Sequence, residues 1–271
     1  MRFLPSFRNG HGAEGPPLPF YLGRFFSRFS PEAEEYRSLR TAIELTLHGR
    51  EAKTFLVTSP GPGEGKSTLV ANLGLLFWEF GRNVLLVDCD LRMPSLHKIF
   101  GLRNAKGLTD LLVGNADPLT LPIKLKDGFA VVPRGGAASH PSVLLRSLAF
   151  RKVLALYREQ ADVILMDSSP LLAVSDVIQI VPASDAVILV VQAGQTQRRD
   201  VVKAKRLLAA ARASLLGTVL NQVEPADGPS YYRGGRYRNY FYDGHVTRDV
   251  MIRRAGPEPS GPAGGAGPSG P

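Results

Sequence analysis

The stretch TSPGPGEGKSTL, Thr58–Leu69, decides the fold of this chain. It follows a short apolar run at residues 54–58, which predicts a buried strand, and it leads into residues 67–80, whose apolar spacing predicts a buried helix. A strand, a glycine-rich turn, Lys-Ser and a helix are, in that order, the parts of a loop that binds nucleotide phosphates. The alternative is a Gly/Pro turn that precedes Lys-Ser by chance.

The residues of this loop have separate tasks. Backbone N–H groups of the turn and the N-terminus of the helix attract phosphate oxygens, and Gly63 and Gly65 let the backbone approach them closely. We expect Lys66 to reach the β- and γ-phosphates and the Ser67 hydroxyl to bind Mg²⁺. The first position of the GxxxxGK[ST] pattern holds Pro60 instead of glycine. The residues that we expect to bind the nucleotide are Gly61, Pro62, Gly63, Glu64, Gly65, Lys66, Ser67 and Thr68.

Strand and helix patterns alternate along the rest of the core. The predicted strands are residues 54–58, 84–88, 129–132, 162–166, 186–191 and 216–220. The predicted helices are residues 31–48, which Ser30 would cap, and residues 67–80, 141–159, 174–181 and 198–213. Such alternation predicts an α/β fold with a doubly wound, mostly parallel sheet, in which ligands bind at the carboxyl ends of the strands.

Three aspartates follow two of the predicted strands. Asp167 ends one apolar run, and Asp88 and Asp90 end another. Mg²⁺ prefers hard oxygen ligands, and a buried strand end is a costly place for unpaired carboxylates. We therefore expect Ser67, Asp88 and Asp167 to bind Mg²⁺, with Asp90 completing the site; helix caps or surface turns are the alternative. Asp176 is expected to cap or orient a neighbouring segment.

Composition limits the classes of function. The net charge is +9, and residues 1–30 and 227–254 each contribute +3, so the excess lies mostly outside the core. Basic tails suit nucleic acid, anionic lipid or acidic partners. No run of 18 apolar residues and no secretory pattern is present, so we expect neither a membrane span nor a leader. The single cysteine, Cys89, suits a reducing cytoplasm and is expected to pack, as is His97.

Six motifs in order resemble those of the bacterial tyrosine kinases (BY-kinases) of capsule and exopolysaccharide assembly, in particular the cytoplasmic type that works with a separate membrane adaptor. The motifs are EEYRSLRT (Glu34–Thr41), GPGEGKST (Gly61–Thr68, Walker A), DCDLRMPSLH (Asp88–His97, Walker A′), GLTDLLVG (Gly107–Gly114), ILMDSSP (Ile164–Pro170, Walker B) and GTVLNQV (Gly217–Val223). The departures are Ser168-Ser169 for the more usual Thr-Pro or Ser-Pro, Arg134 for Ala and Val143 for Glu.

The resemblance implies roles for residues of a P-loop kinase domain at 31–224. The catalytic set that it implies is Lys66, Asp88, Asp90 and Asp167, with ATP and Mg²⁺ as cofactors. Asn221 matches a position that contacts adenine in related ATPases. Glu34, Arg37 and Arg40 match an ExxRxxR motif of ring-like self-association; a solvated charged helix face is the alternative reading of that spacing.

A cluster of tyrosines follows the core, in a Tyr/Arg-rich tail at residues 225–254. The five tyrosines are Tyr231, Tyr232, Tyr237, Tyr240 and Tyr242. The resemblance implies that they are phosphoacceptors, modified in trans by a neighbouring subunit. Interleaved Arg, Gly and aromatic residues also describe binders of single-stranded nucleic acid, and a solvated linker is the plain alternative. Residues 255–271, rich in Gly and Pro, are expected to be disordered, and residues 1–30 to form a flexible basic and aromatic segment.

The predicted function is an ATP-dependent protein-tyrosine autokinase that regulates polymerisation and export of capsule or exopolysaccharide. The implied partners are the cytoplasmic segment of a membrane adaptor, further copies of this chain and a phosphotyrosine phosphatase, with nucleic acid disfavoured. The expected location is the cytoplasm, at the inner face of the membrane. One alternative is a partitioning-type switch ATPase, which would carry a Lys where this chain has Gly61. Another is a scaffold that binds ATP without phosphotransfer.

Overall fold

A computed structural model describes residues 31–47 and 53–223. The predicted flexible segment at 1–30, the cap Ser30 and both predicted tail segments, with all five tail tyrosines, lie outside the described residues. No helix among the described ranges combines the length and apolar character needed to cross a membrane.

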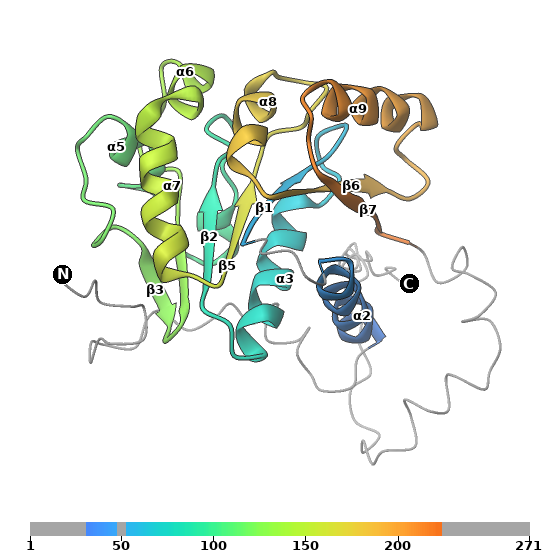
Figure 1. Cartoon of the computed structure of the whole chain (residues 1–271), viewed down its shortest axis with the longest axis horizontal. Coiled ribbons are helices and arrows are strands. Elements are labelled where there is room, and N and C mark those ends of the chain that lie inside the picture. The colour runs from blue at the N-terminus through green and yellow to red at the C-terminus, as the bar shows by residue number, and fades with distance from the viewer. Residues whose placement is uncertain (1–30, 48–52, 224–271) are drawn as a thin grey trace, which may run out of the picture.

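The described residues form one seven-stranded sheet in the order β3-β4-β2-β5-β1-β6-β7 (Figure 1). Neighbouring strands are parallel except for β3 and β4, which pair antiparallel at one edge. The strands are β1 (Thr54–Thr58), β2 (Val84–Asp88), β3 (Ile123–Lys126), β4 (Phe129–Val132), β5 (Val163–Asp167), β6 (Ala186–Gln192) and β7 (Leu215–Asn221). The doubly wound, mostly parallel α/β fold predicted from the sequence is confirmed.

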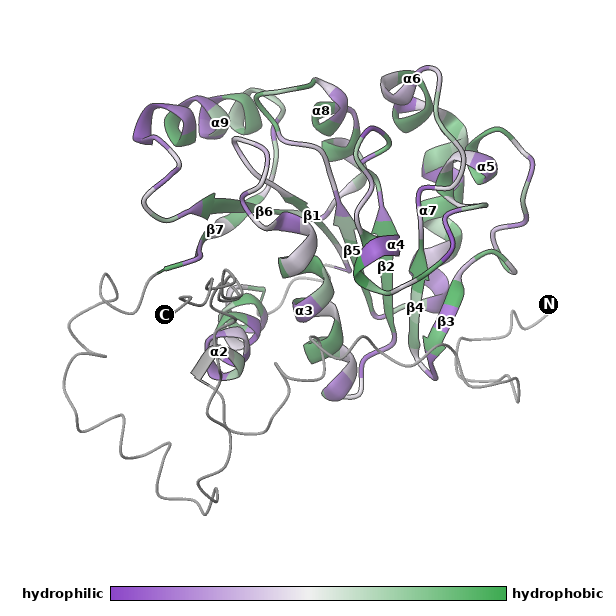
Figure 2. Ribbon diagram, turned by 180° about the vertical axis from the view of Figure 1, so that it is seen from behind, coloured by the Kyte–Doolittle hydropathy of each residue, from purple (hydrophilic) through white to green (hydrophobic). Residues whose placement is uncertain are grey.

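Helices cover both faces of the sheet. One layer contains α2 (Pro31–Thr46), α3 (Lys66–Glu79) and α4 (Leu96–Ile99). The other contains α5 (Leu108–Leu112), α6 (Pro141–Arg146), α7 (Leu148–Gln160), α8 (Asp176–Ile180) and α9 (Arg198–Ala210). A single 3₁₀ turn, η1 (Val181–Ala183), follows α8. Figure 2 shows the strands of the central sheet as a largely hydrophobic layer between the helices.

The central strands are apolar except at their ends because both of their faces are covered. In β1, Leu56 packs into the core on the side of α7 and α9, whereas Phe55 and Val57 pack against α3. Every residue of β1, β2 and β5 is buried. Side chains alternate between the two faces of a strand, so a continuous apolar run supplies two separate cores.

Several short elements differ from the sequence prediction. The predicted helix at 141–159 is wrong as one element, because Ser147 is extended (ψ 156°) and its hydroxyl accepts a hydrogen bond from Phe150 N at 3.2 Å, which starts α7. Strand β3 and the helices α4 and α5 were not predicted. They span only four or five residues, too few for a periodic pattern, and β3 carries two lysines at the edge of the sheet.

Gly107, which precedes α5, provides a test of the packing. A Cβ at this position would overlap the backbone of the loop after β4, at the Pro133 carbonyl and the Gly135 amide. We expect Gly107→Ala to lower the free energy of unfolding by about 1–3 kcal/mol, the usual cost of overpacking. Urea denaturation measures it. Gly136→Ala is the matched control, because a Cβ there meets no atom within 4 Å; equal stability of the two variants would contradict the packing argument.

Candidate nucleotide and metal site

The turn between β1 and α3 is shaped to surround an anion. Gly63 and Gly65 have φ values of 76° and 90°, which L-residues with side chains rarely adopt. Lys66 is the first residue of α3 and is buried, and no side chain caps the helix N-terminus. The first N–H groups of α3 therefore remain available to phosphate oxygens. We call residues 59–67 the phosphate loop.

Asn221, at the end of β7, packs directly on this loop. Its side-chain amide donates to the Glu64 carbonyl oxygen at 3.0 Å. A Cβ on Gly65 would overlap the same amide nitrogen. The glycine is therefore required by its conformation and also by the close approach of Asn221. Sequence reasoning placed both residues at the nucleotide site, and the fold brings them together.

Two buried carboxylates stand side by side next to the phosphate loop. Asp88 and Asp167 are register partners at the ends of the adjacent strands β2 and β5, and both are almost fully buried. Asp88 Oδ1 and both oxygens of Asp167 have no hydrogen-bond partner among the described side-chain and backbone groups. Burial raises the pKa of Asp88 well above its ordinary value, and the charge of Asp167 raises it further.

A nearby positive charge would stabilise the buried carboxylate of Asp167. Burial raises the pKa of Asp167 to about 7, although the neighbouring Ser67 hydroxyl and the Lys66 ammonium favour its charged form. The Ser67 hydroxyl lies beside the carboxylate but not in hydrogen-bonding geometry. Unpaired buried carboxylates are unfavourable unless a cation compensates them. The pair of aspartates with the Ser67 hydroxyl thus forms an oxygen-rich set that suits a hard divalent cation.

Asp90 and the second oxygen of Asp88 have protein partners. Asp90 Oδ1 accepts hydrogen bonds from Ser169 Oγ (2.7 Å), Met93 N (3.0 Å) and Arg92 N (3.2 Å). Asp88 Oδ2 accepts from the backbone N–H groups of residues 95 and 96 at 3.0 and 3.1 Å, which leaves only Oδ1 free. Within the described ranges no three His, Cys, Asp or Glu side chains form a ready-made metal cage. A cation here would take its remaining ligands from phosphate and water, as Mg²⁺ does.

Asp176, at the start of α8, holds the loop that follows β2. Its buried carboxylate accepts from Arg92 Nε at 2.6 Å and from the Ser142 hydroxyl. Burial by itself would raise the pKa of Asp176, but the hydrogen bonds from Arg92 and Ser142 lower it overall. The expectation that Asp176 orients a neighbouring segment is met. Its link to the Walker A′ arginine was not predicted, because α8 lies 84 positions along the chain from Arg92.

The sequence departures lie around the same loop. Arg134 donates to the Leu91 carbonyl oxygen at 3.3 Å and so contacts the Walker A′ segment directly. The hydroxyl of Ser169 reaches Asp90, as described above. Val143, by contrast, is exposed on α6. Cys89 is fully buried in the core, as expected, and His97 packs with its Nδ1 buried and unpartnered among the described residues.

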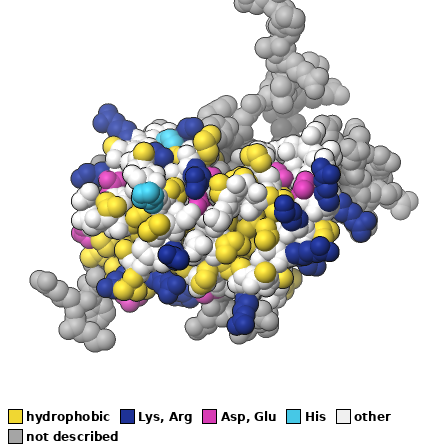
Figure 3. All heavy atoms as spheres, turned by 90° about the horizontal axis from the view of Figure 1, so that it is seen from above, with side chains coloured by type: hydrophobic (Ala, Val, Ile, Leu, Met, Phe, Trp, Pro, Cys, Tyr) yellow, Lys and Arg dark blue, Asp and Glu magenta, His cyan; other side chains and the backbone are white. Residues whose placement is uncertain are grey.

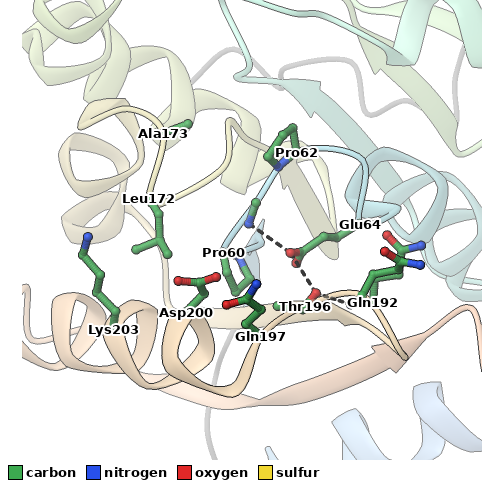
Figure 4. Close-up of a pocket in the computed structure, with 12 residues that line it drawn as sticks. Pro60, Pro62, Glu64, Leu172, Ala173, Gln192, Thr196, Gln197, Asp200 and Lys203 are labelled. Atoms are coloured by element: carbon green, nitrogen blue, oxygen red, sulfur yellow. Dashed lines mark hydrogen bonds between the residues drawn. The ribbon is translucent and has the colours of Figure 1, made fainter.

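A pocket of about 550 Å³ lies beside the phosphate loop (Figure 4). It is bounded by the loop residues 60–64, the segment before α8 and the start of α9, and its lining includes none of Lys66, Ser67, Asp88 or Asp167. Glu64 forms part of its wall and accepts hydrogen bonds from Gly61 N at 3.0 Å and from Thr196 Oγ1 at 2.9 Å. Thr196 was not predicted from the sequence, since only the fold brings it next to Glu64.

The predicted oligomer residues form pairs within α2. Arg37 pairs with Glu34 at 3.1 Å. Arg40 pairs with Glu44 at 2.8 Å, and its guanidinium lies 3.7 Å from the centre of the Phe80 ring at the end of α3. The side chain of Arg40 is only 13% exposed, compared with 46% for Glu34. Arg40 therefore fastens α2 to the core, whereas Glu34 is more exposed and Arg37 is partly buried.

Fold and site together define a P-loop nucleotide-binding protein. The family model described as the CobQ/CobB/MinD/ParA nucleotide binding domain (CbiA) matches residues 55–255. Tyrosine-protein kinase YwqD of Bacillus subtilis (strain 168) is 35% identical over 212 residues, which make up 78% of this chain and 90% of YwqD. The crystal structure of the chimerical protein CapA2B2 has a TM-score of 0.71 at 30% identity, covering 77% of this chain and 95% of that one.

A longer relative aligns over only part of its length. The succinoglycan biosynthesis transport protein ExoP of Rhizobium meliloti (strain 1021) is 29% identical over 233 residues, 80% of this chain but 29% of ExoP. The chain belongs to the bacterial tyrosine-protein kinases, within the CobQ/CobB/MinD/ParA nucleotide-binding family. The resemblance found in the sequence motifs is confirmed.

The contact between Arg92 and Asp176 gives a prediction with a pH dependence. We expect Asp176→Asn to lower the free energy of unfolding by about 1–3 kcal/mol at pH 7, because hydrogen bonds to a charged group are weakened. The folded pKa of Asp176 is lowered, so its stabilising effect is present above the unfolded pKa of about 3.9 and is lost as pH falls through the folded value. Urea denaturation from pH 7 to pH 3 should show the two proteins converging; an undiminished gap at the acidic end would contradict this role.

Proposed function

We propose that this chain is an ATP-dependent tyrosine autokinase whose phosphoryl acceptors are its own tail tyrosines, residues 231–242. The observation that carries the proposal is the joint placement of the phosphate loop and the unpartnered atoms of Asp88 and Asp167 at the carboxyl ends of adjacent strands. A nucleotide triphosphate with Mg²⁺ matches both halves of that arrangement, the anion-binding turn and the carboxylates that lack a cation.

Each residue would have a defined task. Backbone N–H groups of the phosphate loop and Lys66 would hold the β- and γ-phosphates, and Asn221 would contact the adenine side of the nucleotide. Ser67, Asp88 and Asp167 would hold Mg²⁺, with Asp90 completing the site by fixing the Walker A′ loop around it. Bound Mg-ATP would supply the γ-phosphoryl group with part of its negative charge neutralised.

Asp88 is also placed to take part in proton transfer. Its one free oxygen, Oδ1, would serve either as a water-mediated ligand of Mg²⁺ or as the base that accepts the proton of the tyrosine hydroxyl as that oxygen bonds to the γ-phosphorus and ADP leaves. Positioning and electrostatic stabilisation account for most of the catalysis in phosphoryl transfer, so few further groups are needed.

The cellular role follows from the relatives. One of them is named for succinoglycan biosynthesis and transport, which supports regulation of capsule or exopolysaccharide polymerisation and export here. A membrane adaptor would recruit the chain to the inner face of the membrane, and a phosphotyrosine phosphatase would reverse the modification. Each phosphate adds nearly two negative charges, so several of them would invert the charge of an Arg-rich tail and could loosen an assembly of subunits.

The kinase is tested by phosphotyrosine formation on the purified chain with ATP and Mg²⁺, with and without the cytoplasmic segment of a candidate adaptor. We expect Lys66→Ala and Asp88→Asn to reduce the rate at least about 100-fold, because each removes a charge that acts on the transferred phosphoryl group or on the acceptor proton. A variant with Phe at all five tail tyrosines should hydrolyse ATP but give no signal. ATP hydrolysis without phosphotyrosine in every condition would instead favour a switch ATPase.

Self-association through α2 is tested by exchanging two charges. The double variant Glu34→Arg/Arg37→Glu keeps the ion pair within the helix but reverses the charge at both positions. We expect it to fold normally and to lose self-association in sedimentation experiments with Mg-ATP. Arg40→Ala is unsuitable alone, because it also removes the contact with Phe80. Unchanged assembly of the double variant would mean that these residues are only a solvated helix face.

A further inference from the structure

The pocket beside the phosphate loop is lined by carboxylates that have no part in holding the phosphates or the metal. Two carboxylates face it, those of Glu64 and Asp200, from the phosphate loop and from the first turn of α9 (Figure 4). Glu64 is 5% exposed, and its Oε2 has no hydrogen-bond partner among the described groups. The nearest cation of Asp200 is Arg199, at 4.0 Å, with a side chain that is 80% exposed. One oxygen of Glu64 and the carboxylate of Asp200 therefore lack a close donor among the described residues.

The pocket wall is rigidly built. Thr196 Oγ1 donates to Glu64 Oε1 at 2.9 Å and accepts from Gln192 N at 3.0 Å, so the loop between β6 and α9 is tied to the phosphate loop. Gly61 N and the Asn221 side chain bond the same glutamate residue. The two hydrogen bonds to Oε1 hold the Glu64 carboxylate in the pocket wall, where its Oε2 is buried and unpartnered among the described groups.

The pocket lining combines apolar and acidic side chains. Pro60, Pro62, Leu172 and Ala173 provide apolar surface next to the two acids. Its volume lies in the range of small-ligand sites, and it would hold an aromatic ring and a cationic head together. An exposed arginine beside a tyrosine has both parts, and a guanidinium offers a fork of N–H donors to a carboxylate.

The one cation on the pocket lining, Lys203, forms no ion pair within 4.0 Å with either acid. Lys203 stands at the Leu172 end, on the other side of Asp200 from Glu64 (Figure 4). Three further cations of α9, at positions 198, 199 and 206, line a second groove with Val202, and Lys203 borders both hollows. Figure 3 shows Lys and Arg gathered at one side of the upper surface, towards α9. The acidic pocket is therefore a local exception on a cationic face.

We propose that this pocket binds the arginines that flank the tail tyrosines, in the segment 231–242, and so selects the acceptor. That segment contains Arg233, Arg236 and Arg238 and no acidic residue. The described chain ends at Val223, two residues after the asparagine that touches Glu64. Ten further residues lead to Arg233, and an extended chain of that length spans up to about 35 Å, enough to reach the pocket. The proposal rests on the autokinase function proposed above.

The test uses the full chain with an inert tail, in which the five tail tyrosines are Phe and the three arginines are Gln, so that the protein's own tail does not compete. Into this host go Asp200→Arg or, as the matched control, Asp127→Arg, an exposed aspartate in the turn between β3 and β4. The ligand is a fluorescent peptide of residues 229–242, compared with the same peptide carrying Glu at the three arginine positions. Fluorescence anisotropy with a non-hydrolysable ATP analogue and Mg²⁺ measures binding, and phosphate transfer from ATP measures KM and kcat.

We expect Asp200→Arg to weaken binding of the arginine peptide and to raise its KM about five- to tenfold, with the KM for ATP unchanged. The glutamate peptide should bind poorly to the host and better to Asp200→Arg, which a merely structural role of Asp200 would not produce. Asp127→Arg should match the host. Asp200→Asn, expected to show a smaller loss, replaces the arginine variant if that one does not fold.

Equal affinity of the two peptides for the host, or equal effects of the Asp200 and Asp127 variants, would overturn the pocket assignment. Arginine-dependent binding without phosphate transfer would retain the pocket and reject the kinase. Phosphate transfer that ignores both Asp200 and the peptide arginines would do the reverse.

Discussion

The juxtaposition of Asp88 and Asp167 is the constraint on which the site depends. Two carboxylates buried at the ends of neighbouring parallel strands repel each other and have lost their hydration. The folded state is therefore less stable without a cation at this site than with one. The surrounding contacts hold the acids in place nonetheless. Backbone N–H groups hold Asp88, and the pairs of Asp90 with Ser169 and of Asp176 with Arg92 fix the loop around it.

The sequence determined the parts of the fold that have strong local signals. The strands β1, β2 and β5 contain continuous apolar runs, which are typical of strands with both faces covered. The phosphate loop was recognisable because its glycines and Lys-Ser stand at fixed spacing between a strand and a helix. Parallel strands align their carboxyl ends, so the aspartates that end β2 and β5 could be assigned to one site from the sequence.

Other features required the three-dimensional arrangement. Ser147 divides a helix through a single capping hydroxyl, which is a weak signal inside an amphipathic pattern. Thr196 and Asp176 are ordinary polar residues in the sequence and gain their roles only because the fold brings distant segments together. The outward placement of Glu34 and the inward placement of Arg40 were likewise not separable from spacing alone, since the Phe80 ring that receives Arg40 lies on another helix.

The burial of Cys89 has a practical consequence. This thiol is the only one in the chain and lies between Asp88 and Asp90 in the sequence, and burial together with the charges of the three aspartates raises its pKa well above the ordinary value. A thiolate is the reactive form of cysteine, so the folded protein should be inert to alkylating reagents and to mild oxidants. The rate at which Cys89 is labelled therefore reports how often the strands around the site separate, so this residue is a built-in probe of local opening.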